Sequence, residues 1–164
     1  MMDRDSVVIR PVQPEDNKVL AKVLRKVLVE MGVPKKGTAY EDTALNCMYE
    51  TYQHPRMAYF VAVDKGEILG GAGIAPLPNE EEGICELQKM YFLPELRGKG
   101  IGSRMMETCL DYAKQQKFEK CYLETMPTMT EARKLYKRTG FTDITGPMGN
   151  TGHYNCQAWM LKTL

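Results

Sequence analysis

Apolar positions recur along the chain with two different periods, and glycine or proline residues separate the segments that each period marks. Runs that are β-branched or alternate between apolar and polar residues predict strands. Runs with an apolar residue every three or four positions predict helices. The pattern predicts strands at residues 6–10, 58–64, 67–75, 84–93, 121–125, 141–144 and 157–161, and helices at residues 14–31, 42–52, 101–116 and 129–138.

The order of these elements is β-α-α-β-β-β-α-β-α-β-β, which predicts a mixed α/β (α+β) fold around one sheet. Residues 58–64 and 67–75 have the pattern of a hairpin that turns near Lys65 and Gly66. Thr128 and Glu131 have the spacing of a capping box, which predicts the start of the last helix. A length of 164 residues without a linker-like stretch predicts one domain over residues 1–164.

Composition narrows the class of protein. A hydrophobic content of 43% and a charged content of 26% are ordinary for a soluble globular protein. The formal net charge of +1 argues against a nucleic-acid binder, which needs a basic face. Residues 1–5 lack the apolar core of a signal peptide, and the longest apolar run, 58–63, is too short to span a membrane. The five cysteines form no Cys-x-x-Cys pair, so we expect reduced thiols and a cytoplasmic protein.

The most informative stretch follows the predicted strand at 84–93 and begins the third predicted helix. It reads Arg97-Gly98-Lys99-Gly100-Ile101-Gly102. Backbone N–H groups at a helix start have no partner within the helix, and glycines let the backbone approach an anion closely. Arg97 and Lys99 add positive charge. The order of strand, glycine loop and helix therefore predicts a phosphate site, although a simple turn explains the spacing equally well.

Two nucleotide-binding motifs do not fit this loop. The dinucleotide fingerprint needs a third glycine where this chain has Ser103 or Met105, depending on the glycine that begins the count. The P-loop pattern is absent as well. What remains is Arg-x-x-Gly-x-Gly at 97–102, which resembles the pyrophosphate loop of the GNAT superfamily of acyl-CoA-dependent N-acetyltransferases. Residues 132–141 read Ala-Arg-Lys-Leu-Tyr-Lys-Arg-Thr-Gly-Phe and resemble that family's Ala-x-x-Leu-Tyr-x-x-x-Gly-Phe motif.

The resemblance implies a fold, a co-substrate and a reaction. The fold is a mostly antiparallel central sheet, flanked by about four helices, whose fourth and fifth strands splay apart. The co-substrate is acetyl-CoA, and its acetyl group passes to a primary amine of a small molecule or protein by direct attack in a ternary complex. The alternative is a catalytically inactive GNAT-like domain that binds acyl-CoA as a sensor or regulator. A homodimer is the family-level expectation for assembly.

The resemblance also assigns residues. It implies that the glycine loop grips the pyrophosphate, while the strand before it pairs with the pantetheine arm and directs a backbone N–H at the thioester oxygen. The expected cofactor-binding residues are Met90, Tyr91, Phe92, Arg97, Gly98, Lys99, Gly100, Ile101, Gly102 and Ser103. Tyr136 matches the motif tyrosine that acts as a general acid for the thiolate. Met129 stands where the family often has an Asn that touches the pantetheine arm, so that contact is lost or replaced.

The general base is less defined by the motifs. Glu86 lies near the start of the central strand, where several family members carry a glutamate that takes the amine proton. A surface or ion-paired glutamate is an equal alternative at this position. Glu124 and Tyr122 on the next strand are further candidates, and no base is needed if the amine arrives deprotonated.

The acceptor site is expected between the first two helices, their loop at 33–40 and the loop at 145–155. Aromatic residues in these segments suggest an aromatic-lined cavity for an amine. The candidates are Tyr40, Tyr49, Tyr52, His153 and Tyr154. The two histidines, His54 and His153, are too few to predict a metal site.

Overall fold

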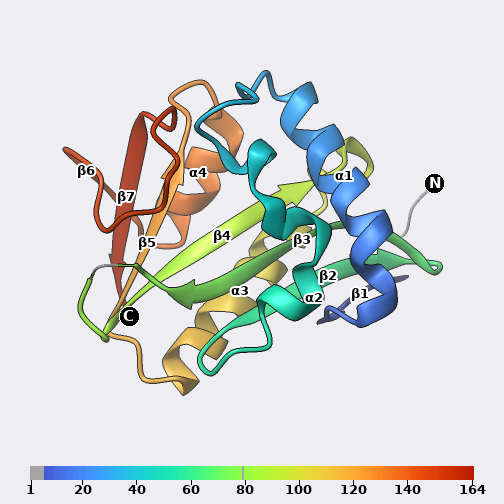
Figure 1. Cartoon of the computed structure of the whole chain (residues 1–164), viewed down its shortest axis with the longest axis horizontal. Coiled ribbons are helices and arrows are strands. Elements are labelled where there is room, and N and C mark those ends of the chain that lie inside the picture. The colour runs from blue at the N-terminus through green and yellow to red at the C-terminus, as the bar shows by residue number, and fades with distance from the viewer. Residues whose placement is uncertain (1–5, 79) are drawn as a thin grey trace.

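A computed structural model describes residues 6–78 and 80–164, so the expectation about a signal peptide at residues 1–5 lies outside the described residues. The strands form one seven-stranded sheet in the order β1-β2-β3-β4-β5-β7-β6 (Figure 1). Neighbouring strands run antiparallel except β4 and β5, which are parallel. The strands are β1 (Val7–Pro11), β2 (Ala58–Asp64), β3 (Glu67–Pro76), β4 (Ile84–Phe92), β5 (Lys120–Thr125), β6 (Thr142–Ile144) and β7 (Ala158–Thr163).

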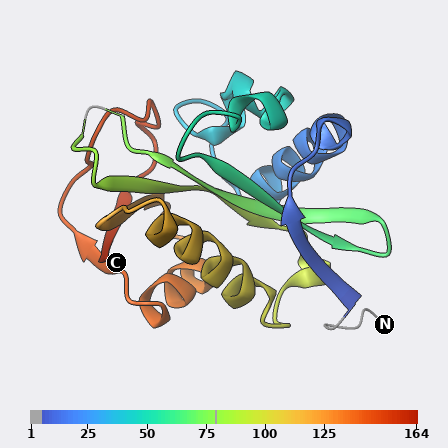
Figure 2. The same cartoon turned by 90° about the horizontal axis from the view of Figure 1, so that it is seen from below.

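Four α-helices cover the two faces of the sheet, which confirms the predicted fold class. They are α1 (Asn17–Glu30), α2 (Met48–Thr51), α3 (Ile101–Gln115) and α4 (Thr130–Arg138). Seen along the sheet, α1 and α2 lie on one side and α3 and α4 on the other (Figure 2). The predicted stripe on α3 is fully buried: Ile101, Met105, Cys109 and Ala113 are each 0% exposed. Burying a side chain as large as Ile or Met contributes about 1.5–3 kcal/mol, so this stripe fixes α3 against the sheet.

The parallel pair β4 and β5 separates soon after it begins. The two strands pair only at Ile84 with Lys120, Cys85 with Cys121 and Glu86 with Tyr122. Both strands continue for several residues beyond these pairs, to Phe92 and Thr125. The splay between the fourth and fifth strands is therefore confirmed, and it opens a gap inside the sheet immediately after Glu86.

A bulge in β4 accompanies the splay. The pairing register with β3 shifts between Gly71 and Gly73, opposite the segment from Gln88 to Tyr91. Lys89 lies within this segment and has a φ of +52°. The bulge changes which way the strand's side chains point, so residues before and after it line the same region of the gap.

The helix predicted at residues 42–52 is wrong. This segment forms a 3₁₀ turn at Thr43–Asn46 and only one α-helical turn, α2 (Met48–Thr51). Asp42 is extended, with φ −62° and ψ 120°, and its carboxylate contacts His153 and Lys89. These tertiary ion pairs hold Asp42 out of the helix, so local periodicity does not decide the segment.

The predicted capping box at Thr128 and Glu131 is also wrong. Helix α4 begins at Thr130 with Met129 as its N-cap, and no side chain caps it. The Met129 N–H donates to the Met126 carbonyl at 3.0 Å, which forms a turn ahead of the helix. That turn delays the helix start. With Met129 as the N-cap, Glu131 is the second helical residue (N2), whereas a capping box needs its glutamate at the third (N3).

In the described part of the chain, none of the helices is both long and apolar enough to cross a membrane. The described cysteines are all free thiols, as predicted. Three of them are buried in the core, namely Cys85, Cys109 and Cys121.

Candidate active site

The glycine loop between β4 and α3 leaves the first turn of the helix open. Gly98 and Gly100 have φ values of +75° and +77°, a left-handed conformation that glycine adopts without a Cβ clash. Gly100 is the N-cap of α3 and makes no side-chain cap hydrogen bond. A Cβ built on Gly98 meets nothing within 4 Å, so the loop faces open space. The first-turn N–H groups and the helix dipole can therefore act on an anion placed there.

The edge of β4 beyond Glu86 carries backbone groups that β5 does not pair. Leu93 donates its N–H to the Leu69 carbonyl of β3 at 2.8 Å. Because direction alternates along a strand, the N–H and C=O of Phe92 point the opposite way, into the gap. The Phe92 carbonyl accepts hydrogen bonds from Nε and Nη2 of Arg97, at 3.1 and 2.8 Å. Arg97 thus fixes the end of β4, and the Phe92 N–H faces the gap.

A cavity of about 350 Å³ runs from the glycine loop along the splayed end of β4 to the start of α4. Most of the predicted cofactor-binding residues line it: Met90, Tyr91, Phe92, Arg97, Gly98, Gly100 and Gly102. Lys99, Ile101 and Ser103 are not among the residues that line it. The open helix start, the unpaired strand edge and this cavity fit the pyrophosphate and pantetheine parts of an acyl-CoA.

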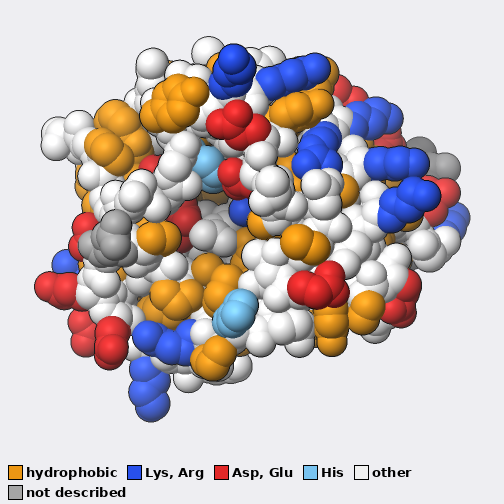
Figure 3. All heavy atoms as spheres, in the orientation of Figure 1, with side chains coloured by type: hydrophobic (Ala, Val, Ile, Leu, Met, Phe, Trp, Pro, Cys, Tyr) orange, Lys and Arg blue, Asp and Glu red, His pale blue; other side chains and the backbone are white. Residues whose placement is uncertain are grey.

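A second cavity, of about 50 Å³, adjoins the first. The two share Met90, Tyr91, Met129 and Tyr136 in their walls. Figure 3 shows its surroundings: a histidine lies together with acidic and basic side chains around a hollow in the face over β4. Tyr136 is 6% exposed, and burial raises the pKa of its phenol to about 12. The tyrosine therefore keeps its proton at neutral pH at the point where the two cavities meet.

Met129 occupies the junction of the cavities in place of the family's Asn. The Thr125 hydroxyl lies 3.7 Å from the Met129 sulfur. A thioether has no hydrogen to donate and accepts only weakly, so it cannot reproduce the contacts of an amide. At this position the chain replaces a polar contact by an apolar wall.

Glu86 lines the second cavity and is 5% exposed. Burial raises the pKa of its carboxyl to about 7, although the hydrogen bond from Gln88 opposes the shift. Gln88 Nε2 donates to Glu86 Oε1 at 2.6 Å, and the Tyr52 hydroxyl donates to Gln88 Oε1 at 2.5 Å. This chain of hydrogen bonds fixes the orientation of a carboxyl group that titrates near neutral pH.

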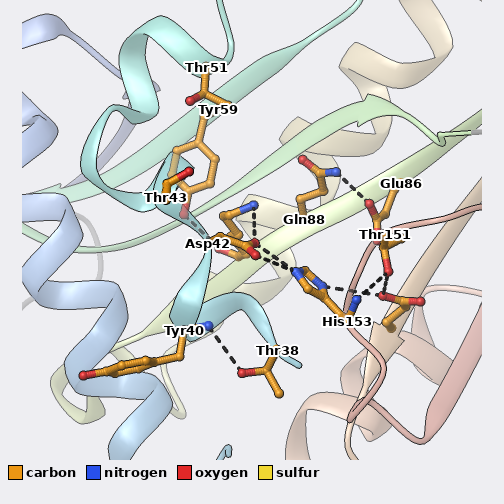
Figure 4. Close-up of polar contacts among 12 residues, drawn as sticks. Thr38, Tyr40, Asp42, Thr43, Thr51, Tyr59, Glu86, Gln88, Thr151 and His153 are labelled. Atoms are coloured by element: carbon orange, nitrogen blue, oxygen red, sulfur yellow. Dashed lines mark hydrogen bonds and ion pairs between the residues drawn. The ribbon is translucent and has the colours of Figure 1, made fainter. Parts of the chain in front are cut away.

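Beside the hydrogen bonds of Glu86, a second polar cluster joins His153 to Asp42 and Glu124 (Figure 4). His153 Nε2 lies 2.9 Å from Asp42 Oδ2, and its Nδ1 lies 3.6 Å from Glu124 Oε1. Burial lowers the pKa of His153, but the hydrogen bonds to Asp42 and Glu124 outweigh it and raise the pKa to about 9. His153 is therefore a cation at neutral pH and joins the loop at 145–155 to the segment before α2 and to β5.

Glu124 and Tyr122, the further candidates for the base, are engaged with each other. The Tyr122 hydroxyl donates to Glu124 Oε2 at 2.7 Å, and the Thr151 hydroxyl donates to Glu124 Oε1 at 2.5 Å. Both carboxylate oxygens of Glu124 are therefore already occupied as hydrogen-bond acceptors. Among these candidates, Glu86 has the environment best suited to a base.

The aromatic acceptor cavity predicted from the sequence is wrong in its chemistry. Only His153 of the predicted set lines the cavity, and Tyr52 reaches it indirectly through Gln88. Tyr40 packs beneath Arg25 and Lys35, and Tyr154 is 72% exposed. Tyr49 packs in the core beneath α1. Of the predicted framing segments, the loop at 33–40 lines the cavity through Val33, Thr38 and Ala39, and the loop at 145–155 lines it through His153, whereas no residue of α1 or α2 lies in its wall.

Sequence reasoning missed Asp42, Gln88 and Lys89. Lys89 lines the cavity, and its Nζ lies 3.4 Å from Asp42 Oδ2. A signal was present for two of the three, because Gln88 and Lys89 are polar residues in a strand that is otherwise mostly buried. Among the described residues, no group of His, Cys, Asp and Glu side chains has the arrangement of a metal site.

Comparison with known proteins agrees with this geometry. A model of the acetyltransferase (GNAT) family matches residues 25–141. An uncharacterised N-acetyltransferase of Escherichia coli (strain K12), YjgM, is 42% identical over 160 residues, which is 97% of this chain and 96% of that protein. A GNAT-family acetyltransferase from Staphylococcus aureus superposes with a TM-score of 0.85 at 18% identity, covering 96% of this chain and 99% of that one.

A further structure of the same fold contains the predicted co-substrate. The acetyltransferase yncA from Salmonella typhimurium, determined with acetyl-CoA, superposes with a TM-score of 0.77 at 16% identity. That comparison covers 97% of this chain and 94% of the other. The family model spans both sequence motifs, and the E. coli relative spans nearly the whole chain. The protein therefore belongs to the GNAT family of acetyltransferases.

Proposed function

We propose that this protein transfers the acetyl group of acetyl-CoA to a primary amine by direct attack in a ternary complex. The junction of the two cavities at Met90, Tyr91, Met129 and Tyr136 carries this proposal. A thioester positioned along the unpaired edge of β4 would end at that junction. An amine in the second cavity would approach it from the side of Glu86. Such an arrangement suits a single attack without a covalent enzyme intermediate.

Acetyl-CoA, when bound, supplies the thioester whose acetyl carbon the amine attacks. Glu86 would accept the amine proton, because its carboxyl has a pKa of about 7 and lies in the acceptor cavity. Tyr136 would donate its phenolic proton to the leaving thiolate, since it remains protonated at neutral pH. A backbone N–H of β4, that of Met90 or Phe92, would donate a hydrogen bond to the thioester oxygen as negative charge develops there.

The same features favour an enzyme over a sensor. A sensor needs the cofactor site alone, whereas this chain also holds a buried titrating carboxyl, Glu86, and a protonated tyrosine, Tyr136, in the walls of the second cavity. Maintaining a carboxyl group in a buried site costs folding free energy. That cost is expected where the group takes part in proton transfer.

The test is release of free thiol from acetyl-CoA over a panel of primary amines, with purified protein and a Tyr136→Phe variant. Removing the acid should lower kcat roughly 10²-fold while the Kd for CoA changes little. Tyr112→Phe is the matched control, because Tyr112 lines neither of the two cavities. Initial rates with both substrates varied should give intersecting double-reciprocal lines. Parallel lines would rule out the ternary complex, and unchanged turnover in Tyr136→Phe would remove Tyr136 as the acid.

A further inference from the structure

Lys89 is a buried cation in the acceptor cavity that the reaction described above does not use. Its side chain is 8% exposed and lines the cavity together with Glu86 and His153. Its ammonium lies 3.4 Å from Asp42 Oδ2. The same carboxylate is closer to His153, at 2.9 Å. The Asp42 carboxylate therefore forms ion pairs with two cations, and Lys89 is the more distant of the two.

The hydrogen-bonding capacity of Lys89 exceeds what Asp42 supplies. An ammonium group has three N–H donors, and a buried cation is costly unless those donors are satisfied. Glu124, which also lines this cavity, already accepts hydrogen bonds from the Tyr122 and Thr151 hydroxyls. A ligand in the cavity that brings an anionic group would complete the environment of Lys89.

The backbone at Lys89 points to the same role. Its φ of +52° lies in the left-handed region, which non-glycine residues seldom adopt inside a strand. The buried Tyr59 hydroxyl donates to the Lys89 carbonyl at 2.8 Å and holds this conformation. Lys65 and Lys117 also have positive φ, but both are exposed in turns. Strained positions that the surrounding fold fixes in place concentrate at ligand sites.

Building on the proposed function, we propose that the acceptor is an amino acid, a small molecule whose primary amine lies beside a carboxylate. Lys89 binds the carboxylate, and Glu86 faces the amine. The cavity of about 50 Å³ accommodates a small head group. A polyamine would bring a further cation against Lys89 and His153, and a protein N-terminus would bring no carboxylate to add to that of Asp42.

The reaction then balances as a simple acyl transfer. The amine nitrogen forms a bond to the acetyl carbon, the carbon–sulfur bond breaks, and the electron pair leaves with sulfur. The amine proton passes to Glu86, and the thiolate takes a proton from Tyr136. The products are an N-acetyl amino acid and CoA.

The first experiment measures thiol release with the twenty L-amino acids, the amide of each and the amine that each gives on decarboxylation. We expect at least one amino acid to exceed its own amide and amine at least tenfold in kcat/KM. If amides or plain amines react as well as the amino acids, this inference fails and the proposed acetyl transfer stands. If no amine in this panel releases thiol, this inference fails, and the proposed acetyl transfer fails as well if the wider panel of primary amines is also inert.

The second experiment changes Lys89. Lys89→Met and Lys89→Asn both remove the charge, and asparagine tolerates positive φ, so the second variant preserves the bulge. Both should raise KM for the amino acid at least tenfold and reduce its advantage over the amide to near unity. Lys65→Met is the matched control, a lysine of positive φ in the β2–β3 turn, and should keep the preference. Retained preference in Lys89→Asn, with CoA binding intact by thermal shift, would overturn the role of Lys89.

Discussion

At the scale of single residues, burial converts an ordinary carboxyl group into a group that titrates near neutral pH. Glu86 accepts a hydrogen bond from Gln88, which in turn accepts one from the hydroxyl of the buried Tyr52. Because its folded pKa of about 7 lies above the ordinary value of 4.5, the native state holds the proton more tightly than the unfolded chain does. This group's contribution to stability is thus complete below about pH 4.5 and is lost as the pH rises through 7.

The same titration should appear in catalysis. We predict that kcat/KM of the parent falls below about pH 7, as the carboxylate is protonated, and that Glu86→Gln lacks this acidic limb. The variant should also be slower by roughly 10²-fold at pH 8. Glu67→Gln, on the exposed end of β3, is the control and should keep the parent profile. An acidic limb in Glu86→Gln that coincides with the parent's would assign the titration to another group.

At the scale of elements, the cofactor cavity depends on close contact between the start of α3 and α4. A Cβ on Gly102 would lie 2.9 Å from Leu135 Cδ2, so only glycine fits without displacing that side chain. Leu135 itself lines the cofactor cavity. The glycine at this position is therefore required for packing between the helices as much as for access by a phosphate.

We predict that Gly102→Glu abolishes CoA binding, because the new side chain displaces Leu135 and places a negative charge at the helix start. Thermal shift with CoA measures this loss, with circular dichroism to confirm that the variant is folded. Gly146→Glu is the matched control, since a Cβ there meets nothing within 4 Å and its φ is not in the left-handed region. A folded Gly102→Glu protein that still binds CoA would show that the pyrophosphate lies elsewhere.

Elements whose structure follows from the local sequence pattern were predictable. Elements whose structure depends on contacts with distant parts of the chain were not. The hairpin of β2 and β3 and the buried stripe of α3 follow from periodicity alone. The segment at 42–52 does not, because Asp42 is positioned by His153, which lies 111 residues away in the chain. The glycine loop and the tyrosine motif indicated the cofactor half of the site, since both motifs are contiguous. The acceptor half is assembled from separate loops, so its polar chemistry could not be read from adjacent residues.

At the scale of the whole molecule, His153 connects three separate parts of the fold around the acceptor cavity. Its ring joins the loop at 145–155 to Asp42 and to Glu124 of β5. Because its folded pKa of about 9 exceeds the ordinary value of 6.5, its contribution to stability is complete below about pH 6.5 and is lost as the pH rises through 9.

We predict that the parent loses stability between pH 6.5 and 9.5, by on the order of 2 kcal/mol from this group, and that His153→Gln loses much less. Urea unfolding at both pH values measures the difference. His54→Gln, which removes the exposed histidine after α2, should retain the parent's pH dependence. Equal pH dependence in parent and His153→Gln would show that the ion pairs at His153 do not stabilise the fold.

The early separation of β4 from β5 has a mechanical consequence. The sheet consists of two leaves, β1–β4 and β5–β7, which the ladder joins through only three residue pairs at Ile84–Glu86. A relative motion of the two leaves would bend the sheet at these pairs, which include Glu86. A molecule that fills the gap contacts both leaves, so its binding would restrict their motion relative to each other. The position of the Glu86 carboxyl would then change least, because the residues about which two parts rotate move least.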